Sequence, residues 1–246
     1  MFPIRDHNPS ERTPYVTFAL IGLNVLVFAW QYGVLTNVTA SNQFLIDYAF
    51  WPIQFETGSG NVGFLTHMFL HGGFMHLAGN MLFLWIFGDN MEEEMGHLPF
   101  LGFYILSGFA AAYLQYLPNP TSAIPMVGAS GAIAGVMGGY LLLFPKARVD
   151  VLLFFVVIVR IIPIPSFIVL GIWMALQVVN GLGSDLQGGG TAYWAHVGGF
   201  IAGFVMTLPI WLRRGSTHYW DRTEGHPPHP EASYSRSNIP IIRRNR

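Results

Sequence analysis

Residues 128–144 read GASGAIAGVMGGYLLLF, an uncharged stretch that predicts a helix over 130–145. A second apolar segment, 194–212, begins beside His196 and contains Gly199-x-x-x-Gly203. Small residues at helical spacing let membrane helices approach backbone to backbone. The first helix offers such a surface through a set of glycines and one alanine: Gly131, Ala132, Gly135, Gly138 and Gly139. We therefore expect these two helices to pack closely, with Ser130 and His196 at their adjacent ends.

The composition is that of an integral membrane protein. Hydrophobic residues make up 52% of the 246 positions and charged residues only 10%, whereas soluble domains have about 25% charged residues. A net charge of −1 gives no indication of a nucleic-acid partner. The absence of cysteine excludes disulfides, thiolate metal sites and a cysteine nucleophile from these residues. The expected surroundings are a lipid bilayer.

The expected fold class is an all-α membrane protein, a six-helix bundle with an apolar, interfacial first loop over 35–71. Residues 149–163 are expected to form an interfacial hairpin. We divide the chain into an N-terminal segment (1–13), a six-helix domain (14–212) and a disordered tail (213–246). Apolar runs place the transmembrane helices, near 14–34, 72–90, 98–117, 130–145, 164–182 and 194–212.

Lysine and arginine set the expected orientation. All 12 lie in the N-terminal segment, in the connection 146–160 or near the C-terminus. The loops 35–71, 118–129 and 183–193 contain none. Because cytoplasmic loops carry the excess of positive residues, both termini are expected in the cytoplasm.

Four polar side chains have nearly the same predicted depth. Ser130, His196 and His76 each precede a charged residue at the cytoplasmic end of their helix by sixteen or seventeen positions. At the rise of an α-helix, they lie about 24–26 Å above the inner boundary of a hydrocarbon core about 30 Å thick. Asn80 lies one turn deeper, on the same face as His76.

A hydroxyl and an imidazole at one depth are the minimum for acyl transfer. Ser130 alone could be a helix N-cap, and His196 alone an interfacial histidine. Their matched depth on glycine-faced helices favours catalysis, with Ser130 as nucleophile and His196 as base. His76 and Asn80 are candidate oxyanion donors, with interhelical hydrogen bonding as the alternative. The predicted helices 130–145 and 194–212 contain no Asp or Glu, so we expect a dyad without a carboxylate.

Three histidines, His67, His71 and His76, raise the question of a metal site. There is no His-Glu-x-x-His pattern and no carboxylate near them in the sequence. We therefore expect neither a metal nor a cofactor, and interpret His67 and His71 as loop-packing residues. Glu92 is expected to have a structural role, bonding the backbone of a neighbouring segment.

Four motifs in this order resemble the rhomboid family of intramembrane serine proteases. They are His71-x-x-x-x-His76-x-x-x-Asn80, Gly88-x-x-x-Glu92-x-x-x-Gly96, Gly128-Ala129-Ser130-Gly131 and Ala195-His196-x-x-Gly199-x-x-x-Gly203. The resemblance implies a serine endopeptidase without a cofactor that cleaves transmembrane-anchored protein substrates at or near the membrane surface. The spacing of Ser130 and His196 from the cytoplasmic ends of their helices puts the expected site below the outer surface. Ser130 would be its nucleophile and His196 its base. His76, Asn80 and the Ser130 N–H would hold the oxyanion. The expected location is the plasma membrane of a prokaryotic cell.

The chain departs from the family pattern at three places. Val62-Gly63 stands where many relatives have Trp-Arg, Glu94 where an arginine is frequent, and Ala134 where an aromatic residue often underlies the histidine. The last departure requires something else to orient the His196 ring. Two alternatives to a protease are a catalytically inactive relative that binds membrane proteins and a transporter with a polar pathway.

Overall fold

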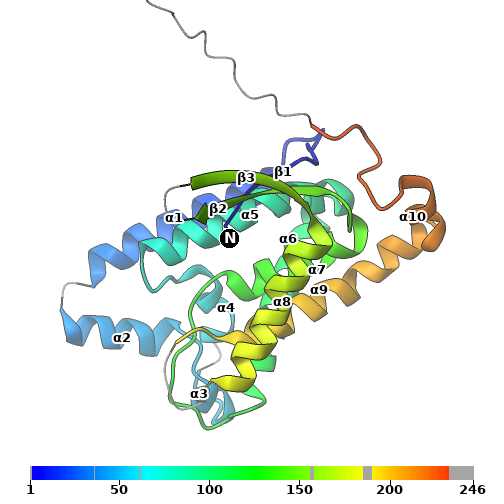
Figure 1. Cartoon of the computed structure of the whole chain (residues 1–246). Helices are drawn as coiled ribbons and strands as arrows, with labels where there is room; N and C mark the ends of the chain where they lie inside the picture. Colours follow the sequence, from blue (N-terminus) through cyan, green and yellow to red (C-terminus); the bar gives the residue numbers. More distant parts are fainter. Residues whose placement is uncertain (1, 36, 61, 156–157, 185–189, 233–246) are drawn as a thin grey trace, which may run out of the picture.

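The computed structural model describes residues 2–35, 37–60, 62–155, 158–184 and 190–232. Its long helices form one bundle (Figure 1) and occupy the six predicted ranges, so the predicted helical membrane bundle is confirmed. They are α1 (Tyr15–Val34), α5 (Phe74–Met95), α6 (His97–Tyr116), α7 (Ser130–Leu143), α8 (Ser166–Gly183) and α9 (Tyr193–Arg213).

The six helices differ in how they could cross a membrane. In the described part of the chain, α1, α6, α8 and α9 are each long and apolar enough to span it alone. Helix α5 passes the same test together with the segment Gly63–Phe69, from which it is bent by 88°. Helix α7 has only 14 residues, and all except Ser130 and Leu141 are buried. Because other helices surround α7, its length need not match the bilayer.

Helices α7 and α9 touch backbone to backbone, as their small residues predict. A Cβ atom added to Gly199 would lie 1.9 Å from the carbonyl oxygen of Gly131, and one added to Gly203 would lie 2.0 Å from that of Gly135. No side chain fits in so little space. This contact therefore requires glycine at positions 199 and 203, and it brings the first turns of the two helices together.

The segment before α5 folds over one end of the bundle. It contains α2 (Val38–Tyr48), α3 (Pro52–Glu56), α4 (Gly63–Thr66) and the short 3₁₀ helix η1 (His67–Phe69). The backbones of Phe50 and Met126 exchange two hydrogen bonds of 2.8 and 3.1 Å. Gly63 approaches Ala49 so closely that a Cβ atom would lie 2.1 Å from the Ala49 carbonyl oxygen. These contacts anchor the loop although the Trp-Arg pair is missing.

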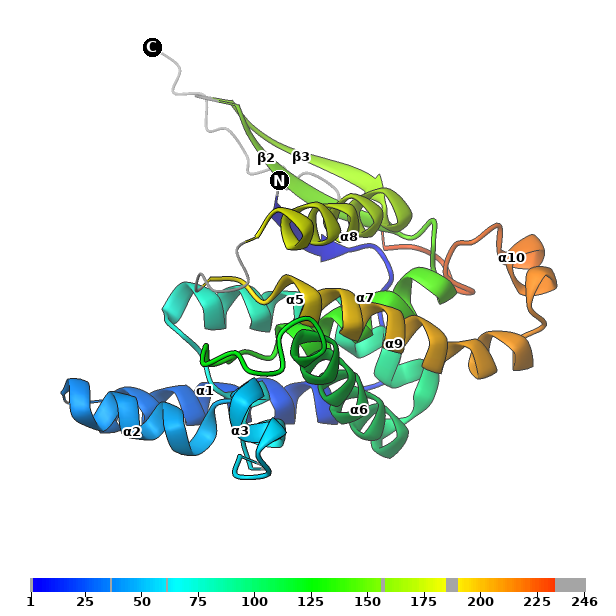
Figure 2. The ribbon, with the colours of Figure 1, turned by 90° about the horizontal axis from the view of Figure 1, so that it is seen from below.

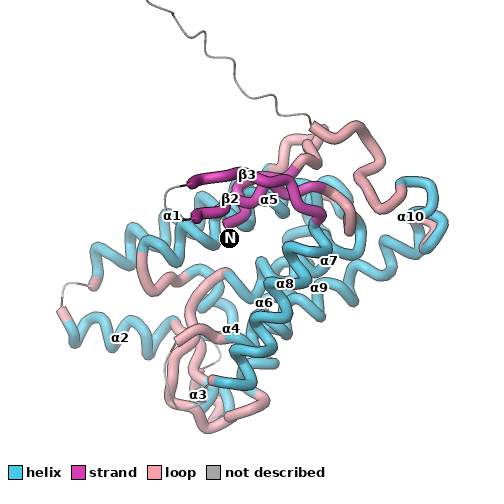
Figure 3. The backbone as a smooth tube through the Cα atoms, in the orientation of Figure 1, coloured by secondary structure: helices cyan, strands magenta, loops and turns pink. Residues whose placement is uncertain are grey.

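A three-stranded antiparallel sheet lies toward the other end of the molecule (Figure 3). Its strands are β1 (Phe2–Asp6), β2 (Arg148–Phe155) and β3 (Ile158–Pro165), in that order. Strands β2 and β3 form the predicted hairpin. The N-terminal strand was not foreseen, because its pairing with β2 joins segments far apart in the chain. Asp150 of β2 bonds to the N-terminal segment: Arg5 Nε donates to one carboxylate oxygen at 2.6 Å, and His7 Nε2 donates to the other at 2.9 Å.

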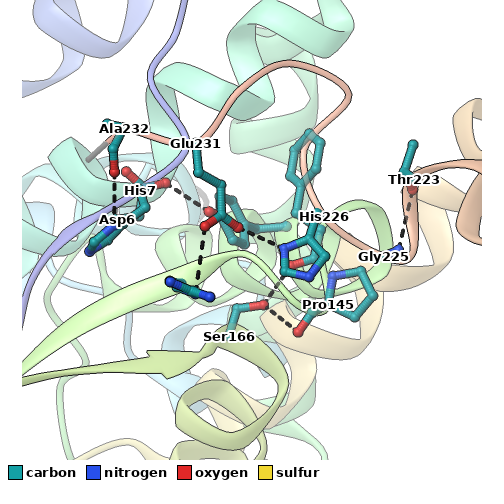
Figure 4. A network of polar contacts seen from close by, with 12 residues as sticks. Asp6, His7, Pro145, Ser166, Thr223, Gly225, His226, Glu231 and Ala232 are labelled. Carbon is teal, nitrogen blue, oxygen red and sulfur yellow. Dashed lines mark hydrogen bonds and ion pairs between the residues drawn. The ribbon is translucent and has the colours of Figure 1, made fainter.

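The prediction that residues 213–246 are disordered is wrong for the part that the structure describes. Helix α10 (Thr217–Thr223) follows α9, and its Tyr219 is buried. Trp220 donates to the Leu142 carbonyl, and the chain continues to Ala232, which exchanges hydrogen bonds with His7 (Figure 4). The buried aromatic ring and these long-range bonds offset the entropy cost of ordering. Residues 233–246 lie outside the described residues.

Candidate active site

Ser130 and His196 lie in contact. Ser130 is the first residue of α7, and His196 lies in the first turn of α9. The Ser130 Oγ and the His196 Nε2 are 2.8 Å apart, which is a hydrogen-bonding distance. The glycine contact between the two helices thus places a hydroxyl beside an imidazole that can accept its proton.

The second ring nitrogen of His196 has an amide as its partner. His196 Nδ1 lies 2.8 Å from Oε1 of Gln177, on α8. Two acids of the loop before α5 are engaged elsewhere: Asp47 accepts from Gln43, and Glu56 from Tyr116. The partner of His196 Nδ1 is therefore the neutral side chain of Gln177 and not a carboxylate.

His76 presents a donor beside Ser130. The backbone N–H of Gly72 donates to His76 Nδ1 at 3.3 Å. Because an accepting nitrogen carries no proton, the neutral ring has its hydrogen on Nε2. A Cβ atom added to Gly128 would lie 2.8 Å from this Nε2 and 3.5 Å from Ser130 Oγ. Gly128 also has a φ of +129°, a conformation that favours glycine.

Asn80 lies one turn further along α5 and is buried. Its Nδ2 is also buried, and within the described residues it has no hydrogen-bond partner. A buried donor without an acceptor is costly. It is also the arrangement expected of a group whose acceptor arrives with a ligand.

The four predicted residues line one cavity of about 1070 Å³. Its wall includes His76 and Asn80 of α5, Ser130 of α7, His196 of α9 and Trp173 of α8. The candidate nucleophile, base and oxyanion donors therefore share a single space large enough to admit water and a segment of peptide.

His67 and His71 lie in the loop before α5. Nδ1 of His67 donates to the Gly63 carbonyl oxygen at 2.9 Å. The backbone of His71 exchanges hydrogen bonds of 2.8 and 3.2 Å with the side-chain amide of Gln31, on α1. Both histidines are buried. Over the described ranges there is no cluster of three His, Cys, Asp or Glu residues that could hold a metal ion.

Glu92 joins the end of α5 to the start of α1. Its carboxylate accepts from the backbone N–H groups of Val16 and Thr17 at 2.8 and 2.7 Å. Both N–H groups belong to the first turn of α1, where helical N–H groups lack partners and a negative charge is favourable. The structural role expected for Glu92 is confirmed. Glu94, in the place of the arginine, pairs with Arg214.

Gln177 and Trp173 are site residues that the sequence analysis missed. A signal was available, because Gln177 is one of three polar residues in the otherwise apolar sequence of α8. Polar side chains inside membrane helices are costly and often functional. What the sequence did not provide was the direction in which α8 points this side chain.

Comparison with known proteins identifies relatives of this chain. A family model described as the Rhomboid domain matches residues 59–213. The chain is 33% identical over 198 residues to the mitochondrial Rhomboid protein 1 of Saccharomyces cerevisiae, covering 77% of this chain and 51% of the yeast protein. It is 27% identical over 206 residues to Rhomboid protease AarA of Providencia stuartii, covering 78% and 71%. With Rhomboid protease GluP of Bacillus subtilis the identity is 32% over 148 residues, covering 60% and 26%. The chain spans about half the length of the first curated relatives that it matches.

Proposed function

Since this chain belongs to the rhomboid family, we propose that it is an intramembrane serine protease that uses Ser130 as nucleophile and His196 as general base. The observation that carries the proposal is the 2.8 Å contact between Ser130 Oγ and His196 Nε2 at the wall of a cavity. The relatives named as rhomboid proteases support the reaction class.

Cleavage would proceed through an acyl-enzyme. Ser130 Oγ attacks the scissile carbonyl carbon while His196 Nε2 takes the hydroxyl proton. The proton then passes to the leaving amine as the peptide bond breaks. Water, deprotonated by the same nitrogen, then attacks the ester carbonyl carbon. The bond from this carbon to Ser130 Oγ breaks, His196 returns the proton to Oγ, and the acid leaves. No cofactor takes part in these steps.

Three donors would stabilise the tetrahedral oxyanion. They are Nε2–H of His76, Nδ2–H of Asn80 and the backbone N–H of Ser130. Since Ser130 begins α7, its N–H has no helical acceptor, and the positive end of the helix dipole adds to it. Donors aimed at a developing charge are often the largest contribution to catalysis.

The proposed substrates are transmembrane-anchored proteins. A substrate helix hides its amides in hydrogen bonds, so it must unwind before its carbonyl reaches Ser130. We expect small or helix-breaking residues near the cleavage site. The protease domain would occupy residues 14–212, flanked by the segments 1–13 and 213–246.

We also propose that both flanking segments face the cytoplasm of a cell whose plasma membrane holds the protein. The absence of Lys and Arg from loops 35–71, 118–129 and 183–193 favours this orientation. The hydrogen bonds between His7 and Ala232 support a common side for the two segments.

Replacing the nucleophile tests the proposed function. Ser130→Ala should reduce cleavage of a membrane-anchored reporter to background, and labelling by a serine-reactive phosphonate should vanish with it. Folding should be preserved, because the hydroxyl bonds only to His196 among the hydrogen bonds of the described residues. Ser41→Ala, on the exposed face of α2, is the matched control and should cleave and label normally. Undiminished turnover in Ser130→Ala would rule out the proposal.

A further inference from the structure

The His196 ring is held from its far side by one residue of α8. Gln177 uses both ends of its side-chain amide. Its Oε1 lies 2.8 Å from His196 Nδ1, and its Nε2 lies 3.3 Å from the carbonyl oxygen of Trp173, one turn earlier. A carbonyl oxygen can only accept, so the NH₂ group must face Trp173. The amide oxygen therefore faces His196.

This orientation determines which nitrogen of His196 carries the proton. An amide oxygen can only accept, so His196 Nδ1 must donate to it. The neutral ring then has no proton on Nε2, the nitrogen that contacts Ser130. The donor of each hydrogen bond in this series is thus fixed: Gln177 Nε2 donates to the Trp173 carbonyl oxygen, and His196 Nδ1 donates to Gln177 Oε1. His196 Nε2 is left to accept the Ser130 proton.

The plane of the His196 ring is supported by the same helix. The rings of Trp173 and His196 lie 5.6 Å apart between centroids, at 36°. Trp173 also lies 6.2 Å from the Phe200 ring, one turn along α9 from His196. Ala134, one turn after the nucleophile on α7, offers no ring for this purpose. The aromatic support for the imidazole comes from α8.

Gln177 lies on the narrow face that α8 presents to the bundle. Only four residues of this helix are buried: Ser166, Leu170, Gln177 and Gly181. A buried amide costs free energy unless its hydrogen bonds are made. The Gln177 amide oxygen bonds to the candidate base and to no other described group. Packing between helices alone would not require the acceptor to face His196.

We propose that Gln177 and Trp173 are positioning residues for the base, Gln177 by selecting the Nδ1–H tautomer of His196 and Trp173 by supporting its ring. The inference rests on the proposed function, because it assigns a task to residues around the same dyad. Since both residues belong to α8, the orientation of the base depends on where this helix lies. Helix α8 is at the edge of the bundle, next to α9 and the β2–β3 hairpin (Figure 2).

The test compares two replacements of Gln177. Gln177→Leu keeps much of the volume but removes the acceptor, and should lower kcat about 10–100-fold with little change in KM, because a hydrogen bond that orients the base is lost. Gln177→Glu presents an acceptor oxygen in either protonation state and should retain most of the wild-type turnover. Leu176→Ala, on the exposed face of α8, is the control and should match the wild type. Rates are divided by the number of sites that a phosphonate labels at completion, so loss of folded protein is not counted as loss of kcat.

The tautomer is measured directly by nitrogen NMR of histidine-labelled protein in micelles. His196→Gln identifies the relevant signals among the nine histidines. Wild type and Leu176→Ala should show the proton on Nδ1, and Gln177→Leu should show a mixture of both tautomers. A proton on Nε2 in the wild type, or a tautomer and kcat unchanged in Gln177→Leu, would overturn the inference.

The two readouts separate this inference from the proposed function. If wild-type protein cleaves and labels while Gln177→Leu is unaffected, the protease assignment stands and the positioning role is wrong. If wild-type protein neither cleaves nor labels, but Gln177→Leu shifts the tautomer, the protease assignment fails and the role of Gln177 in setting the His196 proton is supported.

Discussion

Asn80 is the residue at which stability and function conflict most directly. Its buried Nδ2 has no acceptor among the described residues, which costs free energy in the folded protein. An oxyanion formed at Ser130 would supply the acceptor. A group that is unfavourable in the resting protein and satisfied in the transition state contributes to kcat rather than to substrate affinity.

Asn80→Ala should therefore depress kcat without lowering the unfolding temperature. Losing one oxyanion donor typically costs about 10²–10³-fold, and His76 and the Ser130 N–H soften the loss here. KM should change less than kcat. Steady-state cleavage and thermal unfolding, measured on the same preparations, give both quantities.

Asn90→Ala is the matched control on the same helix. Asn90 Nδ2 donates to the Asn8 carbonyl oxygen at 2.6 Å, so this variant should melt earlier while its folded fraction turns over normally. If Asn80→Ala behaved in that way, Asn80 would be a structural residue and the oxyanion role would be excluded.

Two helices in backbone contact control the distance between Ser130 and His196. Helices α7 and α9 approach so closely that no Cβ atom fits at Gly199. The separation of the helices and the geometry of the proposed dyad are consequently linked, because each of its two residues is fixed to the first turn of its own helix. A change in the packing between these helices should therefore change the reactivity of Ser130.

Gly199→Ala should weaken both stability and activity. The added methyl group would lie 1.9 Å from the Gly131 carbonyl oxygen, so the helices must separate, at a typical cost of about 1–3 kcal/mol. The rate of phosphonate labelling should fall as Ser130 and His196 move apart.

Gly102→Ala, on α6, provides the comparison. A Cβ atom there would meet nothing within 4 Å, and alanine favours a helix over glycine. This variant should melt no earlier than the wild type and label at the same rate. Normal labelling in Gly199→Ala would show that the helix contact does not control the dyad.

At the scale of the whole molecule, the segment that contains β1 contacts the chain that follows α10, far away in the sequence. Asp150 of β2 holds Arg5 and His7, and His7 reaches Ala232. Figure 4 shows the related bonds: Glu231 pairs with His226, and the Ser166 hydroxyl, at the start of α8, bonds to the Pro145 carbonyl oxygen. The bonds of Asp150 and His7 thus connect the N-terminal segment, β2 and the chain that follows α10.

Asp150 should make the stability of these contacts depend on pH. Burial acts to raise the pKa of Asp150, but hydrogen bonds from His7 and Arg5 outweigh it and leave the pKa below its ordinary value. An acid with a lowered folded pKa stabilises the protein above its unfolded pKa of about 3.9, and this contribution is lost as the pH falls through the folded pKa.

Asp150→Asn should therefore lower stability at pH 7 by roughly 1–3 kcal/mol. The difference from wild type should shrink as the pH falls below about 4, which thermal unfolding in micelles can measure. Asp221→Asn is the control, because that carboxylate is exposed on α10 and exposed pairs contribute little. A difference that stayed constant with pH would contradict the assigned ionic role.

The local pattern was sufficient to predict the helices and the grouping of the four candidate site residues at one level. Apolar runs mark where a chain can cross a bilayer, and the fixed rise of a helix converts sequence spacing into depth. This is why Ser130, His196, His76 and Asn80 could be assigned to one region. The glycines of α7 and α9 predicted a close contact, because small residues have few other uses at that spacing.

Only the tertiary structure decided which way each side chain turns and which distant segments meet. The bond from Gln177 to His196 depends on the rotation of α8 about its axis, which an almost wholly apolar helix does not reveal. The pairing of β1 with β2, and the ordered chain from Thr217 to Ala232, arise from long-range contacts. The bond from Arg5 to Asp150 joins residues more than a hundred positions apart, and the bond from Trp220 to Leu142 joins residues nearly eighty apart. Sequence periodicity carries no information about partners at such distances.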